Sequence, residues 1–141
     1  MVSVARSVRI HATAEEVWRA LVDVPGWPRW ASQMERLELL DEPFGLGSRV
    51  RVKPKGMRAA VWRVTVYEPP RSFTWAARLG PGARLEGGHV VEPDGEGCRV
   101  TLSLASSGPF AALLSPMLAR AFRRNTAQAT EGLKRFFEKR S

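Results

Sequence analysis

The sequence contains very few of the residues from which covalent and metal-based sites are built. Its 141 residues include one cysteine, Cys98, and two histidines, His11 and His89. One cysteine cannot form an internal disulfide, and one Cys with two distant His residues lacks the ligand set of a zinc site. Motifs of serine hydrolases, zinc peptidases, dinucleotide-binding folds and phosphate loops are also missing. We therefore expect no metal and no cofactor, with Cys98 as a core residue in the reducing cytoplasm.

Long uninterrupted hydrophobic runs are missing as well. Arg6 and Arg9 stand where a signal peptide needs an apolar stretch. Residues 101–119 carry no charge, but their Ser, Gly and Pro residues would leave polar backbone unsatisfied in lipid. We expect neither a signal peptide nor a transmembrane segment. The apolar fraction of 44% excludes wholesale disorder, and the length predicts one domain, residues 1–141.

Acidic residues are too few to balance the basic ones, which leaves a formal net charge of +8. Such a charge favours nucleic-acid or anionic membrane partners. The basic residues are scattered among acids, however, and the one dense run begins with Arg49, Arg51 and Lys53, which alternate with valines. Alternation places the three on one face of a strand. We interpret this face as solvated, with an anion-binding patch as the alternative, and we expect no specific nucleic-acid partner.

The hydrophobic pattern predicts one strand, two short helices, six further strands and a long final helix. Alternation indicates a strand over 2–10, and a capping box from Thr13 to Glu16 begins a helix that ends at Pro25-Gly26. A second short helix begins at Trp27. Strands follow over 35–41, 48–53, 60–68, 71–79, 83–92 and 98–107, separated by short Pro/Gly turns that favour an antiparallel meander. Residues 109–140 form the helix, which Pro116 kinks or begins.

Each later strand has one apolar face, as in Trp62, Val64 and Val66. A sheet with such a face needs a cover, and the long amphipathic helix is the only large one available. A twisted seven-stranded sheet curls around that helix, which does not fill the whole concavity. The expected fold is α+β, with a cavity between the sheet and the C-terminal helix.

Five sequence stretches carry a family resemblance: IHATAEEVWRALVD (10–23), WPRW (27–30), VYEPPRSFTW (66–75), EPDGEGCRVT (92–101) and GLKRF (132–136). In their order and spacing the chain resembles the SRPBCC, or START-like, superfamily, and most of all its polyketide cyclase/dehydrase type. The resemblance spans nearly the whole chain. It implies a helix-grip fold, in which a seven-stranded antiparallel sheet wraps a long C-terminal helix and two short helices lie between the first and second strands. Many ligand binders share this fold, so the resemblance does not name one function.

Polar residues on the inward strand faces are the candidate catalytic groups, because an unpaired polar group is costly there. His89 shares the parity of Leu85 and Val91 and should point into the cavity, where it orients a ligand or moves a proton. The alternative is a structural histidine satisfied by a neighbour. Arg6 shares the parity of the first strand's apolar residues, and either meets a ligand anion or reaches solvent at the sheet rim.

Aromatic and helix residues complete the expected site. Trp62 and Trp75 face inward on neighbouring strands, where they either pack the core or contact a planar ligand. Asn125 and Gln128 lie near the apolar stripe of the helix and either bind ligand or face solvent. For Trp18, Trp27 and Trp30, packing in the core and a place at the mouth of the pocket are equally weighted alternatives. The expected ligand contacts are Trp62, Val64, Trp75, Ala77, His89, Leu102, Phe122, Thr126 and Ala129.

We interpret the chain as a carrier or sensor of a small hydrophobic or polycyclic molecule, such as a lipid. The first alternative is an enzyme, a cyclase, aromatase or dehydratase of a polyketide-like substrate, in which His89 and Arg6 assist proton transfer. The second alternative is a basic protein- or RNA-binding regulator. A homodimer is left open.

Overall fold

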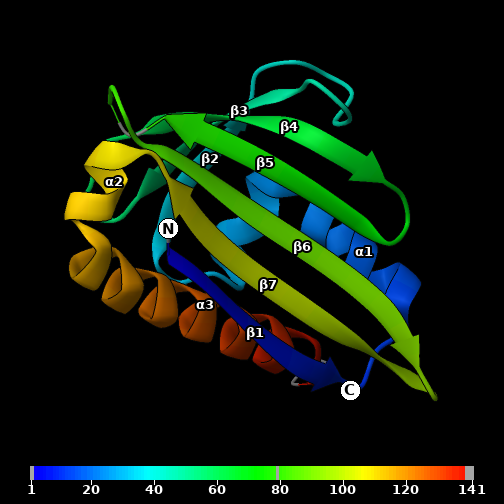
Figure 1. Ribbon diagram of the computed structural model, residues 1–141. Helices are drawn as coiled ribbons and strands as arrows, with labels where there is room; N and C mark the ends of the chain where they lie inside the picture. Colours follow the sequence, from blue (N-terminus) through cyan, green and yellow to red (C-terminus); the bar gives the residue numbers. More distant parts are fainter. Residues whose placement is uncertain (1, 79, 139–141) are drawn as a thin grey trace.

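A seven-stranded antiparallel sheet curls around one long helix in the computed structural model, which describes residues 2–78 and 80–138 (Figure 1). The strands are β1 (Val2–Ile10), β2 (Met34–Leu39), β3 (Arg49–Pro54), β4 (Ala60–Glu68), β5 (Ser72–Arg78), β6 (Arg84–Asp94) and β7 (Gly97–Ser107). Their order, β1-β7-β6-β5-β4-β3-β2, joins the first strand to the last and runs the others as a meander. The expected α+β helix-grip architecture is confirmed. The expected strand residue Leu79 lies outside the described residues.

The connection between β1 and β2 holds α1 (Ala14–Val22) and the 3₁₀ helix η1 (Val24–Arg29). The capping box is present, since the Glu16 amide donates to Thr13 Oγ1 at 3.1 Å and the Thr13 amide to Glu16 Oε1 at 3.4 Å. The sequence prediction was wrong about the break at Pro25-Gly26, because Pro25 lies in the first turn of η1. Proline is tolerated there, since that turn does not need its N–H.

Strand β4 departs from simple alternation. Its register against β5 shifts between Val64 and Val66, and this bulge changes which residues face inward. Val64 is 1% exposed, as expected, but Val66 is 40% exposed and Tyr67 packs against the core instead. The sequence prediction that Val66 shares the inward face was therefore wrong.

The C-terminal segment divides into a short α2 (Pro109–Leu113) and the long α3 (Ser115–Glu138). Pro116 lies in the first turn of α3, so it marks the start of that helix rather than a kink. Near its other end, α3 packs so closely on η1 that a Cβ on Gly132 would collide with the Trp30 carbonyl oxygen. Lys134 Nζ also donates to the Arg9 carbonyl at 2.8 Å. These contacts fix the C-terminal half of α3 across the sheet.

The hydrophobic core has two parts. The main cluster joins α1, η1 and the sheet to the C-terminal half of α3, for example at Leu133 and Phe137. A small second cluster lies where α2 and the first turns of α3 meet the other end of the sheet: Ala83, Ala111, Leu118 and Phe122. The two halves of α3 are thus held by different sets of side chains. Among the described helices, none is long and apolar enough to cross a membrane.

Candidate functional site

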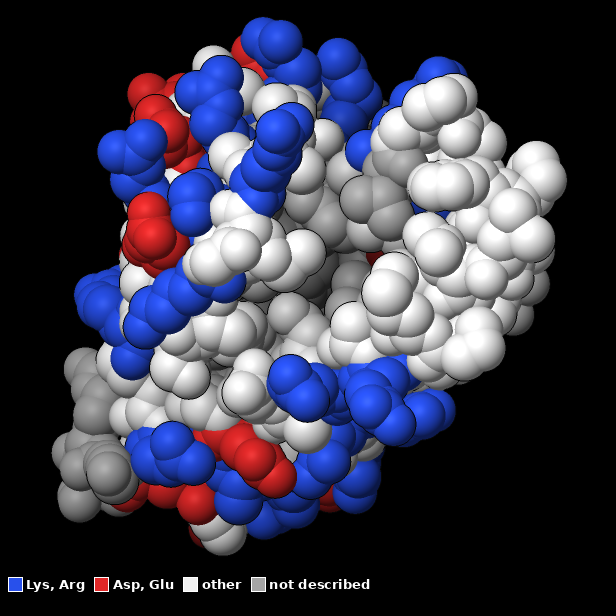
Figure 2. All heavy atoms as spheres, turned by 90° about the vertical axis from the view of Figure 1, so that its left-hand side faces the viewer, with Lys and Arg blue, Asp and Glu red and all other residues white. Residues whose placement is uncertain are grey.

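A cavity of about 460 Å³ lies between the concave face of the sheet and α3. Figure 2 shows the molecule hollowed on the side that holds α2 and the start of α3, with basic side chains around the hollow. Side chains from η1, the six strands β2 to β7 and α3 contribute to the wall, and both core clusters border it. Trp75 and Leu102 belong to the main cluster, and Leu118 and Phe122 to the second. This volume is typical of small-molecule sites.

One wall of the cavity is aromatic. The ring centroid of Trp75 lies 5.1 Å from that of Trp27 and 5.7 Å from that of Trp62. The ring centroids of Trp27 and Trp30 are also 5.1 Å apart. Trp27 is held in place because its Nε1–H donates to the Leu21 carbonyl at 3.0 Å. Four indoles in tilted contact offer large flat apolar surfaces, which suit a planar or ring-shaped molecule.

His89 lies in this wall and has one ring nitrogen already bound. It is paired with Phe73 across β5 and β6, and the two rings stack at 4.1 Å with an interplanar angle of 11°. His89 Nδ1 lies 3.1 Å from the Phe73 carbonyl oxygen. A carbonyl only accepts, so Nδ1 carries the proton and Nε2 presents a lone pair. Burial lowers the pKa of His89 from 6.5 to about 4, against the opposite effect of the Phe73 hydrogen bond. The imidazole is neutral at pH 7.

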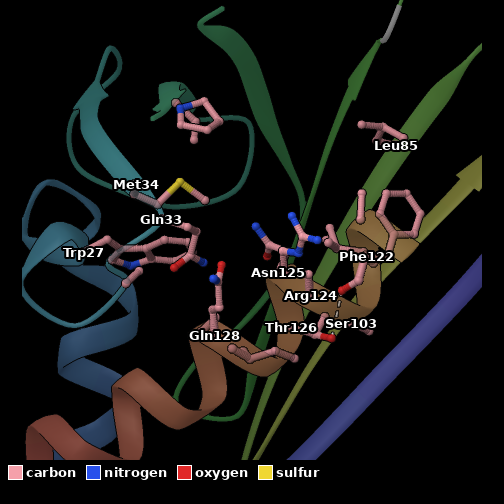
Figure 3. A pocket seen from close by; sticks show the side chains of 18 of the residues that line it. Trp27, Gln33, Met34, Leu85, Ser103, Phe122, Arg124, Asn125, Thr126 and Gln128 are labelled. Atoms are coloured by element: carbon pink, nitrogen blue, oxygen red, sulfur yellow. Dashed lines mark hydrogen bonds between the residues drawn. The ribbon is translucent and has the colours of Figure 1, made fainter. Parts of the chain in front are cut away.

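Polar side chains gather toward the opening. In Figure 3, Arg124, Asn125 and Gln128 project from α3, with Gln33 and Met34 across from them. Gln33 Oε1 is buried and has no hydrogen-bond partner among the described residues. Lys55 is exposed and also lines the cavity, and its amide donates to the Gln33 carbonyl at 3.0 Å. The site therefore combines an apolar interior with a polar, positively charged opening.

The structure brings together seven of the nine residues expected to contact ligand: Trp62, Trp75, His89, Leu102, Phe122, Thr126 and Ala129. Val64 and Ala77 are buried but do not line the cavity. Arg6 lies on the sheet rim instead, where its Nη2 pairs with Glu131 Oε1 at 3.1 Å and about half of each side chain is exposed. Whether the seven residues bind ligand stays a prediction.

Sequence reasoning missed other wall residues. Leu85 shares the strand parity of His89, so alternation could have added it to the site. Gln33 and Met57 lie outside the strands, where no periodic pattern identifies them. Trp27 and Trp30, for which packing and the mouth were alternatives, are buried and line the cavity. Among residues 2–78 and 80–138, no three potential metal ligands of the His, Cys, Asp or Glu type cluster together.

Comparison with solved structures gives the fold independently. The di-domain aromatase/cyclase BexL of the BE-7585A biosynthetic pathway superposes with a TM-score of 0.81 at 20% identity, over 98% of this chain and 47% of that one. The chain thus spans about half the length of BexL. The Zhui aromatase/cyclase of Streptomyces sp. R1128 gives 0.78 at 21% identity, over 99% and 94%. A START superfamily protein of Mycobacterium smegmatis gives 0.76 at 16% identity, over 99% of both chains.

The sequence comparisons add the family. No curated protein matches the chain. A family described as polyketide cyclase/dehydrase and lipid transport matches residues 1–138, which is nearly the whole chain. With the helix-grip fold and its cavity, this match leads to one conclusion: the chain belongs to the polyketide cyclase/dehydrase and lipid transport family.

Proposed function

We propose that residues 1–141 form one ligand-binding domain, which holds a small, mostly apolar, ring-containing molecule in the cavity and serves as a carrier or sensor. The observation that carries this proposal is the four-tryptophan wall around a single neutral imidazole. Apolar surfaces drive the burial of the ligand, and one polar group sets its orientation. The family is described as polyketide cyclase/dehydrase and lipid transport, and two structural relatives are aromatase/cyclases; lipids and aromatic polyketides would both fit such a cavity.

The second candidate is a cyclase, aromatase or dehydratase that acts on a ligand in the same cavity. The observation in its favour is that His89 Nε2 is an acceptor with no hydrogen-bond partner among the described residues. A pKa of about 4 makes this nitrogen a weak base, so catalysis would depend mainly on the shape that the walls impose. Arg6 lies away from the cavity, which leaves His89 alone of the two expected catalytic residues.

The test begins with the protein as purified. Native mass spectrometry shows whether a small molecule accompanies it, and titration with the neutral dye N-phenyl-1-naphthylamine measures the capacity of the cavity. We expect micromolar binding with enhanced fluorescence. Ala121→Trp, which fills the cavity from α3, should weaken binding by about tenfold or more. Ala112→Trp is the matched control, because Ala112 is exposed on α2 and does not line the cavity.

One result would contradict both candidates, and another would favour the enzyme over the carrier. Dye binding equal in the wild type and Ala121→Trp, with no co-purified molecule, would contradict ligand binding in this cavity. Conversion of a linear poly-β-keto thioester faster than the uncatalysed reaction, with loss of that rate in His89→Gln, would favour the enzyme over the carrier.

A further inference from the structure

We infer that the ligand carries a hydroxyl group, a phenol or an alcohol, that lies against Gly87, donates a hydrogen bond to His89 Nε2 and accepts one from Trp75 Nε1. This inference rests on the proposed function and names the polar group that the cavity is built to recognise. It follows from one acceptor, one donor and the glycine between them.

The acceptor is the free nitrogen of His89. Because Nδ1 donates to the Phe73 carbonyl, Nε2 has only its lone pair to offer. Burial keeps this side chain neutral at pH 7, and it is 6% exposed. None of the described residues makes a hydrogen bond to Nε2, and the stacked Phe73 ring cannot. Nε2 is not among the inaccessible unpaired atoms of the described residues, so it is open to the cavity. A ligand that fills the cavity covers this atom, and leaving it without a donor would then be costly.

The donor is the indole N–H of Trp75. An indole nitrogen donates and cannot accept, and Trp75 is 4% exposed. Trp27 Nε1 is bound to the Leu21 carbonyl, whereas no described residue accepts from Trp75 Nε1. The Trp75 and His89 rings meet edge to face with their centroids 5.3 Å apart, so the two side chains are neighbours in the same wall of the cavity.

Gly87 shows where the two polar groups converge. It pairs with Trp75 across β5 and β6 and lines the cavity. A Cβ placed on it would lie 2.8 Å from Trp75 Nε1 and 3.7 Å from His89 Cε1, the ring carbon between Nδ1 and Nε2. Any other residue would therefore press on the indole nitrogen and occupy this point. The absence of a side chain keeps both polar atoms accessible from the cavity.

Only some polar groups satisfy both atoms. A ketone or ether oxygen accepts from Trp75 but leaves His89 without a donor. A carboxylate has the same defect and would bury a charge, because the cations of the wall, Lys55 and Arg124, are exposed side chains. A hydroxyl oxygen donates once and accepts as well, so one atom serves both partners.

The experiment compares 2-naphthol, 2-methoxynaphthalene and naphthalene by calorimetry on the wild-type protein. Transfer from water favours the methyl ether, which has more apolar surface than the phenol. We nevertheless expect 2-naphthol to bind about tenfold more tightly than 2-methoxynaphthalene. Trp75→Phe, which keeps a ring but removes the N–H, and His89→Leu should each reduce this ratio several-fold, with near-UV circular dichroism confirming the fold.

Trp62→Phe is the matched control, because it shortens the same aromatic wall away from Gly87 and should weaken all three probes alike. If His89→Leu does not fold, Trp75→Phe and the wild-type ratio still decide the matter. Equal or tighter binding of the methyl ether in the wild type would overturn the hydroxyl inference while leaving the proposed function intact. An unchanged ratio of 2-naphthol to 2-methoxynaphthalene affinity in Trp75→Phe would also overturn the hydroxyl inference and leave the proposed function intact. Failure of every probe to bind would contradict the proposed function as well.

Discussion

The polar side chains of the cavity wall fall into two groups at the level of single residues. Thr126 lines the cavity, but its hydroxyl donates to the Phe122 carbonyl at 2.9 Å, and Thr130 repeats this bond one turn later at 2.8 Å to the Thr126 carbonyl. Both hydroxyl protons are thus used within α3. His89 Nε2 and Trp75 Nε1 are not used by the described protein, and this difference distinguishes groups that build the wall from groups that can recognise a ligand.

The buried imidazole predicts how stability depends on pH. His89 titrates near 6.5 in the unfolded chain and at a pKa of about 4 in the folded one, so between these values the unfolded chain binds more protons. Stability therefore rises with pH, and on the order of 3 kcal/mol is lost as the pH falls from 6.5 toward 4. Urea unfolding of the wild type and of His89→Leu from pH 4 to 7.5 measures this pH dependence of the unfolding free energy. Parallel profiles for the two proteins would contradict the buried neutral state.

At the level of elements, strand alternation was a good guide wherever the ladder is regular. It placed Trp75, His89 and Leu102 on the inward face of β5, β6 and β7, as the structure has them. It failed beyond Val64, because one extra residue in β4 reverses the parity and alternation cannot show a bulge. The helical stripe likewise identified Phe122, Thr126 and Ala129 of α3. Cavity residues in turns, such as Gln33 and Met57, could not be found, since their positions depend on how the turns pack.

The bulge in β4 predicts unequal costs for the same substitution on one strand. Val64→Thr buries a hydroxyl in the main core and should cost roughly 1–3 kcal/mol of unfolding free energy. Val66→Thr, at a side chain exposed by the bulge, should cost less than about 0.5 kcal/mol. Urea midpoints of the two variants provide the comparison. Equal losses would mean that β4 keeps its simple alternation in solution.

For the molecule as a whole, the positive charge is partly neutralised where it is densest. On β3, Arg49 pairs with Asp41 at 2.8 Å, Arg51 with Glu38 at 3.8 Å and Lys53 with Glu35 at 3.5 Å. Hydrogen bonds from Arg49 lower the pKa of Asp41 to about 2. A phosphate approaching this strand must compete with these carboxylates for each cation, which weakens the interpretation as a nucleic-acid surface.

We therefore expect only weak, salt-dependent attraction to nucleic acids. Fluorescence anisotropy with duplex DNA and single-stranded RNA at physiological salt should give dissociation constants of about micromolar or weaker, without sequence preference. Replacing Arg49, Arg51 and Lys53 together by Ser should leave dye binding unchanged, because these side chains do not line the cavity. Tight binding to one sequence would instead support the basic regulator over the ligand carrier.

The division of the core has a consequence for how the cavity is reached. α2 and the first turns of α3 are held by a cluster of four buried residues, beside Leu113 and Met117, which are 79% and 60% exposed. We expect this segment to open locally at a lower free energy than the sheet and the half of α3 beyond Gly132. A bound ligand contacts residues of both clusters, so it must be released before this segment can open. The free energy of local opening therefore rises by about 2.7 kcal/mol when the free ligand is at a hundredfold excess over its dissociation constant. Amide protons of α2 would then exchange more slowly when the ligand is present. The rate at which α2 and the first turns of α3 open would determine how long a molecule stays bound.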